Sequence, residues 1–220
     1  MRMFEVRLWL SKQGRIKYVS HLDMFRLMQR AVRRAEIPLW YTEGFNPHPY
    51  ISFLLALSLG TEGLREPVDI RIVDEMTTDE IKNRLNAAMP EGLCIEAVTT
   101  PVMKPSEIAF GSYRVYYGDS VSESELFTAL TSGELTCEKS GKKGNKKIMK
   151  TVNVSEHIKS FELHTENGGT VLDTILPAGS VFNLNPQQLS AAVSSYLGRE
   201  IVPERVIRLS LLTSDLKEFE

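Results

Sequence analysis

The order of strand-like and helix-like patterns predicts an α+β fold of two tandem ferredoxin-like units, each a βαββαβ series with an antiparallel sheet. Three observations support this prediction. Strands are indicated where apolar and polar residues alternate, helices are indicated where apolar residues recur every three or four positions, and the resulting series occurs twice. We expect the first unit over residues 1–100, a linker over 101–111 and the second unit over 112–220.

In the first unit, local signals define each element. Phe4, Val6 and Leu8 alternate with polar residues and predict the first strand. Ser20 is a favourable N-cap for the helix that follows, and Pro38 ends it. The expected elements are strands at 3–11, 39–42, 51–59, 66–74 and 93–99, with helices at 21–36 and 77–89.

The second unit departs from the ideal series by one inserted hairpin strand. Ser122 is a predicted N-cap, Asn167-Gly168-Gly169 is a hairpin turn signal, and Gly198 is a predicted helix C-cap. The expected elements are strands at 112–117, 135–139, 152–165, 170–176 and 205–212, with helices at 122–132 and 185–196.

The helix predicted over residues 21–36 has one apolar side and one basic side. At about 100° per residue, the basic side carries an arginine stripe composed of Arg26, Arg30, Arg33 and Arg34. Asp23 lies at its N-terminal edge, where it is placed to pair with Arg26. Residues 1–35 contain nine lysines and arginines against two acidic residues, although the whole chain has a net charge of −2. A solvated helix face is one interpretation, but the charge asymmetry favours a polyanion site.

Residues 44–49, here called the GFNPHP loop, carry a second candidate site. Pro47 and Pro49 restrict Asn46 and His48 to extended geometry. The segment is either a rigid structural turn or a display of Asn46 and His48 toward a ligand, with Phe45 as a packing anchor or a stacking platform.

Two histidines are the candidate catalytic residues, His21 and His48. Because His21 lies at a helix N-terminus, it is either a neutral base or a buried, hydrogen-bonded side chain. The residues expected to bind RNA or a partner are Lys17, Tyr18, Arg26, Arg30, Arg33, Arg34, Phe45, Asn46, His48, Lys142, Lys143, Lys146 and Lys147. Those expected to orient them are Ser20, Asp23, Pro47 and Pro49.

A basic segment, residues 139–150, contains six lysines, among them Lys142, Lys143, Lys146 and Lys147. Such a segment is typical of a mobile solvated loop, but together with the arginine stripe it could follow an RNA backbone. Cys94 and Cys137 are isolated, and His157 and His164 have no acidic or cysteine neighbour at ligand spacing. We therefore expect no metal, no cofactor and no disulfide scaffold. No apolar run approaches the roughly 20 residues of a membrane span, so we expect no membrane partner and a cytoplasmic location.

Several of these motifs together resemble the DUF2344 family of "radical SAM-linked" proteins. They are residues 18–23, 30–35, 44–49, 52–53 and 59–60. The matching positions are Tyr18, Ser20, His21, Asp23, Arg33, Asn46, Pro47, His48 and Pro49. Members of this family are stand-alone proteins or C-terminal extensions of B12-binding radical SAM proteins. The resemblance implies a companion role beside a radical enzyme. This sequence lacks the three-cysteine cluster motif of such an enzyme, so we do not expect it to be the radical enzyme itself.

Three functions are consistent with the sequence. The first is a non-catalytic accessory module that binds RNA (tRNA or rRNA) or presents it to a radical SAM enzyme. The second is a metal-independent endoribonuclease, since the chain also resembles, more weakly, the repeat-associated RNA-processing endonucleases, although their late glycine-rich loop is not evident near residues 177–180. The third is a protein-interaction module whose arginine stripe meets an acidic patch on the radical SAM protein.

Overall fold

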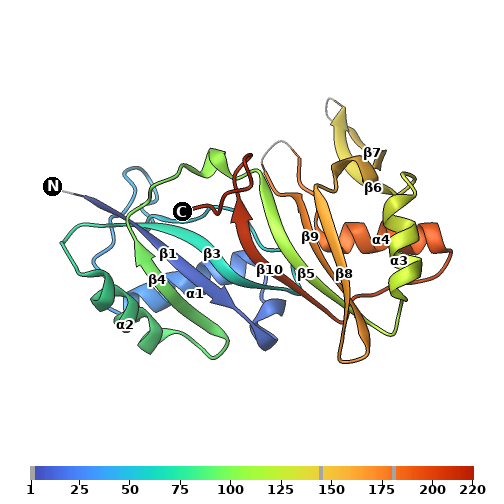
Figure 1. Ribbon diagram of the computed structural model, residues 1–220. Helices are drawn as coiled ribbons and strands as arrows, with labels where there is room; N and C mark the ends of the chain where they lie inside the picture. Colours follow the sequence, from blue (N-terminus) through green and yellow to red (C-terminus); the bar gives the residue numbers. More distant parts are fainter. Residues whose placement is uncertain (1–2, 144–145, 180–181) are drawn as a thin grey trace. The chain divides into compact units, whose positions relative to one another are not determined.

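The computed structural model describes residues 3–143, 146–179 and 182–220 and divides the chain into two compact units (Figure 1). Unit 1 comprises Met1–Ile108 and Arg208–Glu220, and unit 2 comprises Ala109–Ile207. The described residues contain four α-helices and strands that pair mostly antiparallel. The predicted α+β class is therefore confirmed, whereas the assignment of each unit as ferredoxin-like stays a prediction.

Unit 1 places its helices beside a sheet in which β1 lies between β3 and β4. The strand β1 pairs antiparallel with both β3 and β4, and β2 pairs antiparallel with β3. In chain order the elements are β1 (Phe4–Lys12), the 3₁₀ turn η1 (Gly14–Tyr18), α1 (His21–Arg34), β2 (Ile51–Phe53), β3 (Thr61–Ile72), α2 (Thr78–Ala88), β4 (Leu93–Thr99) and the 3₁₀ turn η2 (Pro105–Glu107).

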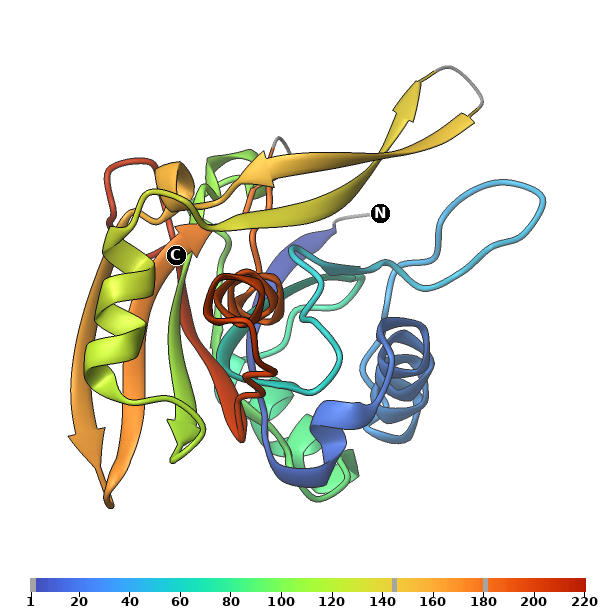
Figure 2. The ribbon, with the colours of Figure 1, turned by 90° about the vertical axis from the view of Figure 1, so that its right-hand side faces the viewer.

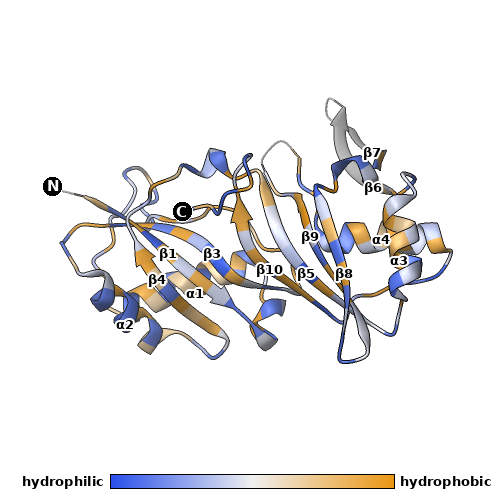
Figure 3. Ribbon diagram, in the orientation of Figure 1, coloured by the Kyte–Doolittle hydropathy of each residue, from blue (hydrophilic) through white to orange (hydrophobic). Residues whose placement is uncertain are grey.

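The core of unit 1 forms where the apolar side of α1 packs against the sheet. Met28 of α1, Leu8 of β1 and Ile70 of β3 are completely buried, and apolar residues recur along the strands in Figure 3. Each such side chain contributes roughly 1.5–3 kcal/mol relative to its exposed state. The predicted amphipathic helix is thus confirmed. Its apolar side packs against the sheet, and the arginine stripe lies on its exposed side.

Four elements of unit 1 differ from the sequence prediction. The helix α1 ends at Arg34 because Glu36 adopts a left-handed φ of 53° and the Ile37 N–H donates to the carbonyl of Val32. Residues 39–42 form only isolated bridges, and β2 is limited to Ile51–Phe53. The strand β3 begins at Thr61, where a polar segment with no alternation concealed its start.

Unit 2 has β9 between β5 and β8, with both pairings antiparallel. Its elements are β5 (Phe110–Gly118), α3 (Glu123–Thr131), β6 (Thr136–Lys143), β7 (Lys146–Asn153), the 3₁₀ turn η3 (Ser155–His157), β8 (Ser160–Glu166), β9 (Gly169–Pro177) and α4 (Pro186–Leu197). The strand β10 (Arg205–Leu212) contributes its first three residues to unit 2 and its remaining residues to unit 1.

The basic segment of unit 2 is not the predicted loop. β6 and β7 pair antiparallel as a separate two-stranded sheet, so the backbone on both sides of residues 144–145 is extended. The predicted strand over residues 152–165 is also wrong, because η3 separates β7 from β8. The side chains of Lys142, Lys143, Lys146 and Lys147 lie outside the described part of the structure, and their role stays a prediction.

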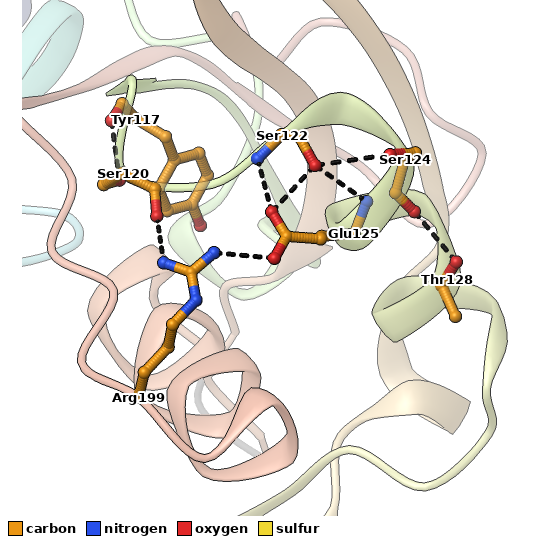
Figure 4. Close-up of polar contacts among 7 residues, drawn as sticks. All are labelled: Tyr117, Ser120, Ser122, Ser124, Glu125, Thr128 and Arg199. Atoms are coloured by element: carbon orange, nitrogen blue, oxygen red, sulfur yellow. Dashed lines mark hydrogen bonds and ion pairs between the residues drawn. The ribbon is translucent and has the colours of Figure 1, made fainter.

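The ends of the two long helices of unit 2 are joined by a polar network (Figure 4). Ser122 caps α3 and also donates through its hydroxyl and its backbone N–H to Glu125. Arg199, which follows the C-cap of α4, donates to Glu125 at 2.8 Å and to the carbonyl of Ser120. Hydrogen bonds from the Ser122 backbone and from Arg199 lower the pKa of Glu125 to about 2.

The last residues of the chain belong to unit 1, whereas the sequence-based division placed them in the second unit. Arg7 donates to the carbonyl of Glu220 at 2.7 Å, and Arg65 pairs with Glu218 at 2.7 Å. Phe219 is buried edge-on against Trp9. These contacts with β1 and β3 hold the tail on unit 1. None of the described helices is long and apolar enough to cross a membrane.

Candidate nucleic-acid interface

The N-terminus of α1 has the predicted polar arrangement. The Ser20 hydroxyl accepts from the backbone N–H of Asp23 at 3.2 Å and donates to the Asp23 carboxylate at 2.7 Å. The other carboxylate oxygen lies 3.1 Å from Arg26 Nη1, so the predicted cap and the predicted Asp23–Arg26 pair are both confirmed. The bond from Ser20, followed by that from Arg26, holds the pKa of Asp23 below its usual value.

The four residues of the arginine stripe are exposed but differ in their partners. Arg26 pairs with Asp23, and Arg34 donates to the carbonyl of Ala88 at the end of α2 at 2.6 Å. Within the described ranges, Arg30 and Arg33 make no hydrogen bond or ion pair. They are three positions apart on α1 and are therefore neighbours on its surface. The centre of the stripe thus presents two guanidinium groups to solvent.

Lys17 and Tyr18 lie in η1, just before α1. The Lys17 ammonium is 3.4 Å from the carboxylate of the buried Glu62 and 5.5 Å from the centre of the Tyr18 ring. This ion pair ties η1 to β3, and a role of Lys17 in phosphate binding stays a prediction. Tyr18 is 67% exposed and stays a candidate contact.

The GFNPHP loop is closed by bonds at its base. The Thr42 N–H donates to the carbonyl of His48 at 2.9 Å, the His48 N–H donates to the Thr42 hydroxyl at 3.2 Å, and Tyr41 forms a bridge with Pro49. Figure 2 shows this light-blue segment projecting beyond α1. Phe45 at its tip is fully exposed (106%), so the structure excludes the packing-anchor alternative.

The stem of the loop is held by an aromatic and charged cluster. The Arg71 guanidinium lies 4.3 Å from the centre of the Tyr50 ring and 5.6 Å from that of Trp40, and it pairs with Glu5 at 2.7 Å. The Tyr50 N–H donates to the carbonyl of Trp40 at 2.9 Å. These contacts fix both strands of the stem to β3 and β1, and therefore fix the direction of the loop.

His48 is exposed and its ring has one nitrogen engaged. Its Nδ1 lies 3.1 Å from the Thr42 hydroxyl and 3.2 Å from the carbonyl of Asn46. A carbonyl can only accept, so this contact favours the tautomer with the proton on Nδ1 and leaves Nε2 as an acceptor. Asn46 itself is exposed and contributes its backbone to the contact.

A cavity of about 360 Å³ lies between the C-terminal part of α1 and the GFNPHP loop. Its lining residues are Gln29, Val32, Arg33, Ile37, Leu39, Tyr41, Pro47, His48 and Pro49. The structure therefore brings Arg33 of the arginine stripe together with His48 and both prolines of the loop. Arg26, Arg30, Phe45 and Asn46 lie outside this lining, and Arg34 lines a different cavity with Arg84.

His21 lies elsewhere on unit 1. It is exposed, so the buried alternative is wrong, and its ring meets that of Phe53 edge-on at 5.4 Å. With Lys12 and Glu66 it lines a cavity of about 20 Å³, which is room for about one water molecule. The two candidate catalytic histidines therefore line different cavities.

Sequence reasoning missed the buried charges of unit 1. Arg208 forms a bidentate ion pair with Glu66, with Arg208 Nε 2.9 Å from the carboxylate, and both residues are buried. Lys12 is buried as well and donates to the carbonyl of Val19; burial lowers the pKa of its ammonium, and Glu66 partly offsets this effect. No local sequence signal reveals such long-range pairs.

Sequence reasoning also missed two polar residues of the larger cavity, Gln29 and Tyr41. Gln29 lies four positions before Arg33, so helical spacing alone could have placed both on one side of α1. Tyr41 could not be placed, because its position depends on the bridge to Pro49.

Comparisons with known proteins show a family and a fold relative. A family model described as "Uncharacterized protein conserved in bacteria (DUF2344)" matches residues 5–186. The chain is similar in fold to a chain in a structure titled "Crystal Structure of a Cbf5-Nop10-Gar1 Complex", with 12% identity and a TM-score of 0.52 over 94% of this chain and 49% of that chain. It thus spans about half the length of that protein.

A second solved structure, an unknown protein from Galdieria sulphuraria, aligns with 13% identity over 92% of this chain and 98% of that chain, at a TM-score of 0.27 that is too low to indicate a shared fold. No curated protein matches the sequence. The family model, in contrast, covers most of the residues and includes α1 and the GFNPHP loop. The chain belongs to the DUF2344 family.

Proposed function

We propose that this protein is an RNA-binding accessory module whose binding surface consists of the arginine stripe and the GFNPHP loop. The observation that carries the proposal is the pair Arg30 and Arg33, which are exposed and make no hydrogen bond or ion pair in the described part of the chain, although the charge of Arg30 also acts on Asp23. A guanidinium presents a planar set of donors that matches phosphate oxygens, and it stays charged at any physiological pH.

The aromatic residues near these arginines favour RNA over an acidic protein surface. Phe45 is fully exposed and Tyr18 is 67% exposed, so both rings are accessible to a ligand. Proteins that bind single-stranded RNA combine basic residues with exposed aromatic rings on which bases stack. The two kinds of side chain occur here on a helix and on a loop held rigid by two prolines.

The resemblance to radical SAM-linked proteins supplies a candidate partner. We propose that each unit is a ferredoxin-like module and that the chain presents bound RNA to a radical SAM protein that modifies it. The chain would then contribute affinity and position, and the partner would contribute the chemistry. Co-purification of the two proteins, with and without ribonuclease treatment, tests whether RNA bridges them.

The direct test is binding of purified protein to single-stranded RNA across a salt series in EDTA. Each phosphate contact contributes about 0.7 to the slope of log affinity against log salt for single strands, so loss of Arg30 and Arg33 should reduce the slope by roughly 1.4. The variant Arg84→Ala removes an exposed arginine of α2 that pairs with Glu80 and serves as the control. An unchanged slope in the double variant would remove the arginine stripe from RNA binding.

A second candidate function, metal-independent RNA cleavage, is favoured by one observation. The contact of His48 Nδ1 with a carbonyl leaves Nε2 available as a proton acceptor at the edge of a cavity that also contains Arg33. Cleavage in EDTA that is lost in His48→Ala, with binding retained, would establish this activity. Intact RNA after binding supports the accessory module, and binding to the radical SAM protein without affinity for RNA would support a protein-interaction module.

A further inference from the structure

We propose that the cavity between α1 and the GFNPHP loop receives a single unpaired nucleotide; this inference rests on the proposed RNA-binding function and names its substrate class. The cavity volume of about 360 Å³ falls within the range of roughly 300–1,000 Å³ that is usual for small-molecule sites. A base stacked and paired within a duplex cannot enter such a cavity, so the site selects a nucleotide outside a helix.

The cavity wall carries both apolar and polar groups and includes Tyr41. Val32 and Ile37 line it on the side of α1, and Pro47 and Pro49 line it on the side of the GFNPHP loop. Tyr41 is about half exposed (47%), so its ring is available to a ligand. A nucleobase is a flat, largely apolar group whose faces bind to such surfaces by stacking and burial.

The polar lining residues match the remaining parts of a nucleotide. The Gln29 amide carries both donors and an acceptor, as the edge of a base requires. Arg33 lies one helical turn further along and has no polar partner among the described residues, so its guanidinium is available for the phosphate. His48 lines the cavity with its Nδ1 already engaged, which leaves Nε2 for a ribose hydroxyl.

The walls are held in place before a ligand arrives. The left-handed Glu36 and the bond from Ile37 to Val32 fix the end of α1, and the bridge between Tyr41 and Pro49 fixes the opposite side. The Thr42 hydroxyl accepts from the backbone N–H of His48 and contacts its Nδ1, and both contacts hold the histidine ring. Preformed walls reduce the entropy lost when a ligand binds. A site that binds a single nucleotide through few contacts depends on this reduction for its affinity.

The experiment titrates the full chain with the four nucleoside 5′-monophosphates, and in parallel with the nucleosides and with inorganic phosphate. We expect at least one monophosphate to bind more tightly than its nucleoside and than phosphate. Arg33→Ala should weaken its binding about tenfold, the usual effect of losing a hydrogen bond to a charged group. Tyr41→Ala should weaken it at least about fivefold through lost stacking. Arg84→Ala should have no effect.

A second measurement separates this inference from the function it rests on. RNA with an unpaired nucleotide should bind more tightly than a fully paired duplex of equal length, and Tyr41→Ala should remove the difference. If RNA binds with the expected salt slope but monophosphates do not bind and Tyr41→Ala changes nothing, the nucleotide site is refuted and RNA binding stands. If a monophosphate binds in an Arg33- and Tyr41-dependent manner but RNA does not, the site stands and the proposed RNA function is refuted.

Discussion

Two pairs of arginines, one pair in each unit, differ in their partners. In unit 2, Arg114 forms a bidentate ion pair with Asp173 at 2.7 Å, and Arg199 joins Glu125 to the carbonyl of Ser120. On α1 of unit 1, Arg30 and Arg33 are exposed and make no hydrogen bond or ion pair within the described ranges. The first pair stabilises the fold, and the second contributes little to it. The difference indicates that the partner of a charged side chain, rather than its residue type, separates an arginine that stabilises the fold from one that is available to a ligand.

The largest effect is expected where an arginine is both paired and buried. Glu66→Gln should destabilise unit 1 by roughly 3–5 kcal/mol, because it leaves the buried charge of Arg208 without its counterion. Urea denaturation followed by circular dichroism measures the loss. A change below about 1 kcal/mol would show that Arg208 can be hydrated when Glu66 is neutral.

An intermediate effect is expected at the α3 cap. Ser122→Ala removes the oxygen that accepts from the backbone N–H of Glu125, and the loss should be about 1 kcal/mol. Ser195→Ala, which removes an exposed hydroxyl of α4 that bonds to the carbonyl of Ala191 in its own helix, is the matched control. Equal denaturation midpoints for the two variants would contradict the capping role.

A smaller effect, visible mainly through pH, is expected at Glu125. Its pKa of about 2 lies below the usual 4.5, so its contribution to stability is complete above pH 4.5 and is lost as the pH falls toward 2. The stability difference between the wild type and Glu125→Gln should therefore shrink over that interval. A difference that stays constant from pH 5 to pH 2 would show that ionised Glu125 does not stabilise the network.

The smallest effect on stability is expected for Arg30 and Arg33. Arg30→Ala and Arg33→Ala should each change the free energy of unfolding by less than about 0.5 kcal/mol, since both side chains are exposed and no hydrogen bond or ion pair of the described structure is lost. Arg114→Ala, measured alongside, should lower the stability more than either, because it breaks both hydrogen bonds to Asp173. Equal losses in all three variants would remove the distinction between the two uses of arginine.

Local patterns predicted much of the fold. The strands β4 and β10 begin and end at the predicted residues, and α1 begins behind the predicted cap Ser20, because alternation and capping act over a few neighbouring residues. The β6–β7 hairpin was missed, since lysine-rich sequence is typical of loops and nothing local shows that residues 136–143 pair with 146–153.

The candidate site was predictable only in part. The stripe itself follows from helical spacing, and the Asp23–Arg26 pair follows from its spacing of three residues. Which arginines of the stripe have a hydrogen-bond partner was not predictable, because the partner of Arg34 is in α2, 54 residues later. The ion pair of Lys17 similarly depends on Glu62 of β3.

We propose that Arg30 and Arg33 bind RNA phosphates and do not stabilise the fold. The most direct test measures the salt dependence of RNA binding and the free energy of unfolding for the same two proteins, Arg30→Ala/Arg33→Ala and Arg114→Ala. We predict that the double variant loses roughly 1.4 from the salt slope with little change in stability, and that Arg114→Ala loses stability with an unchanged slope. A double variant that keeps the wild-type slope, or that loses as much stability as Arg114→Ala, would contradict the claim.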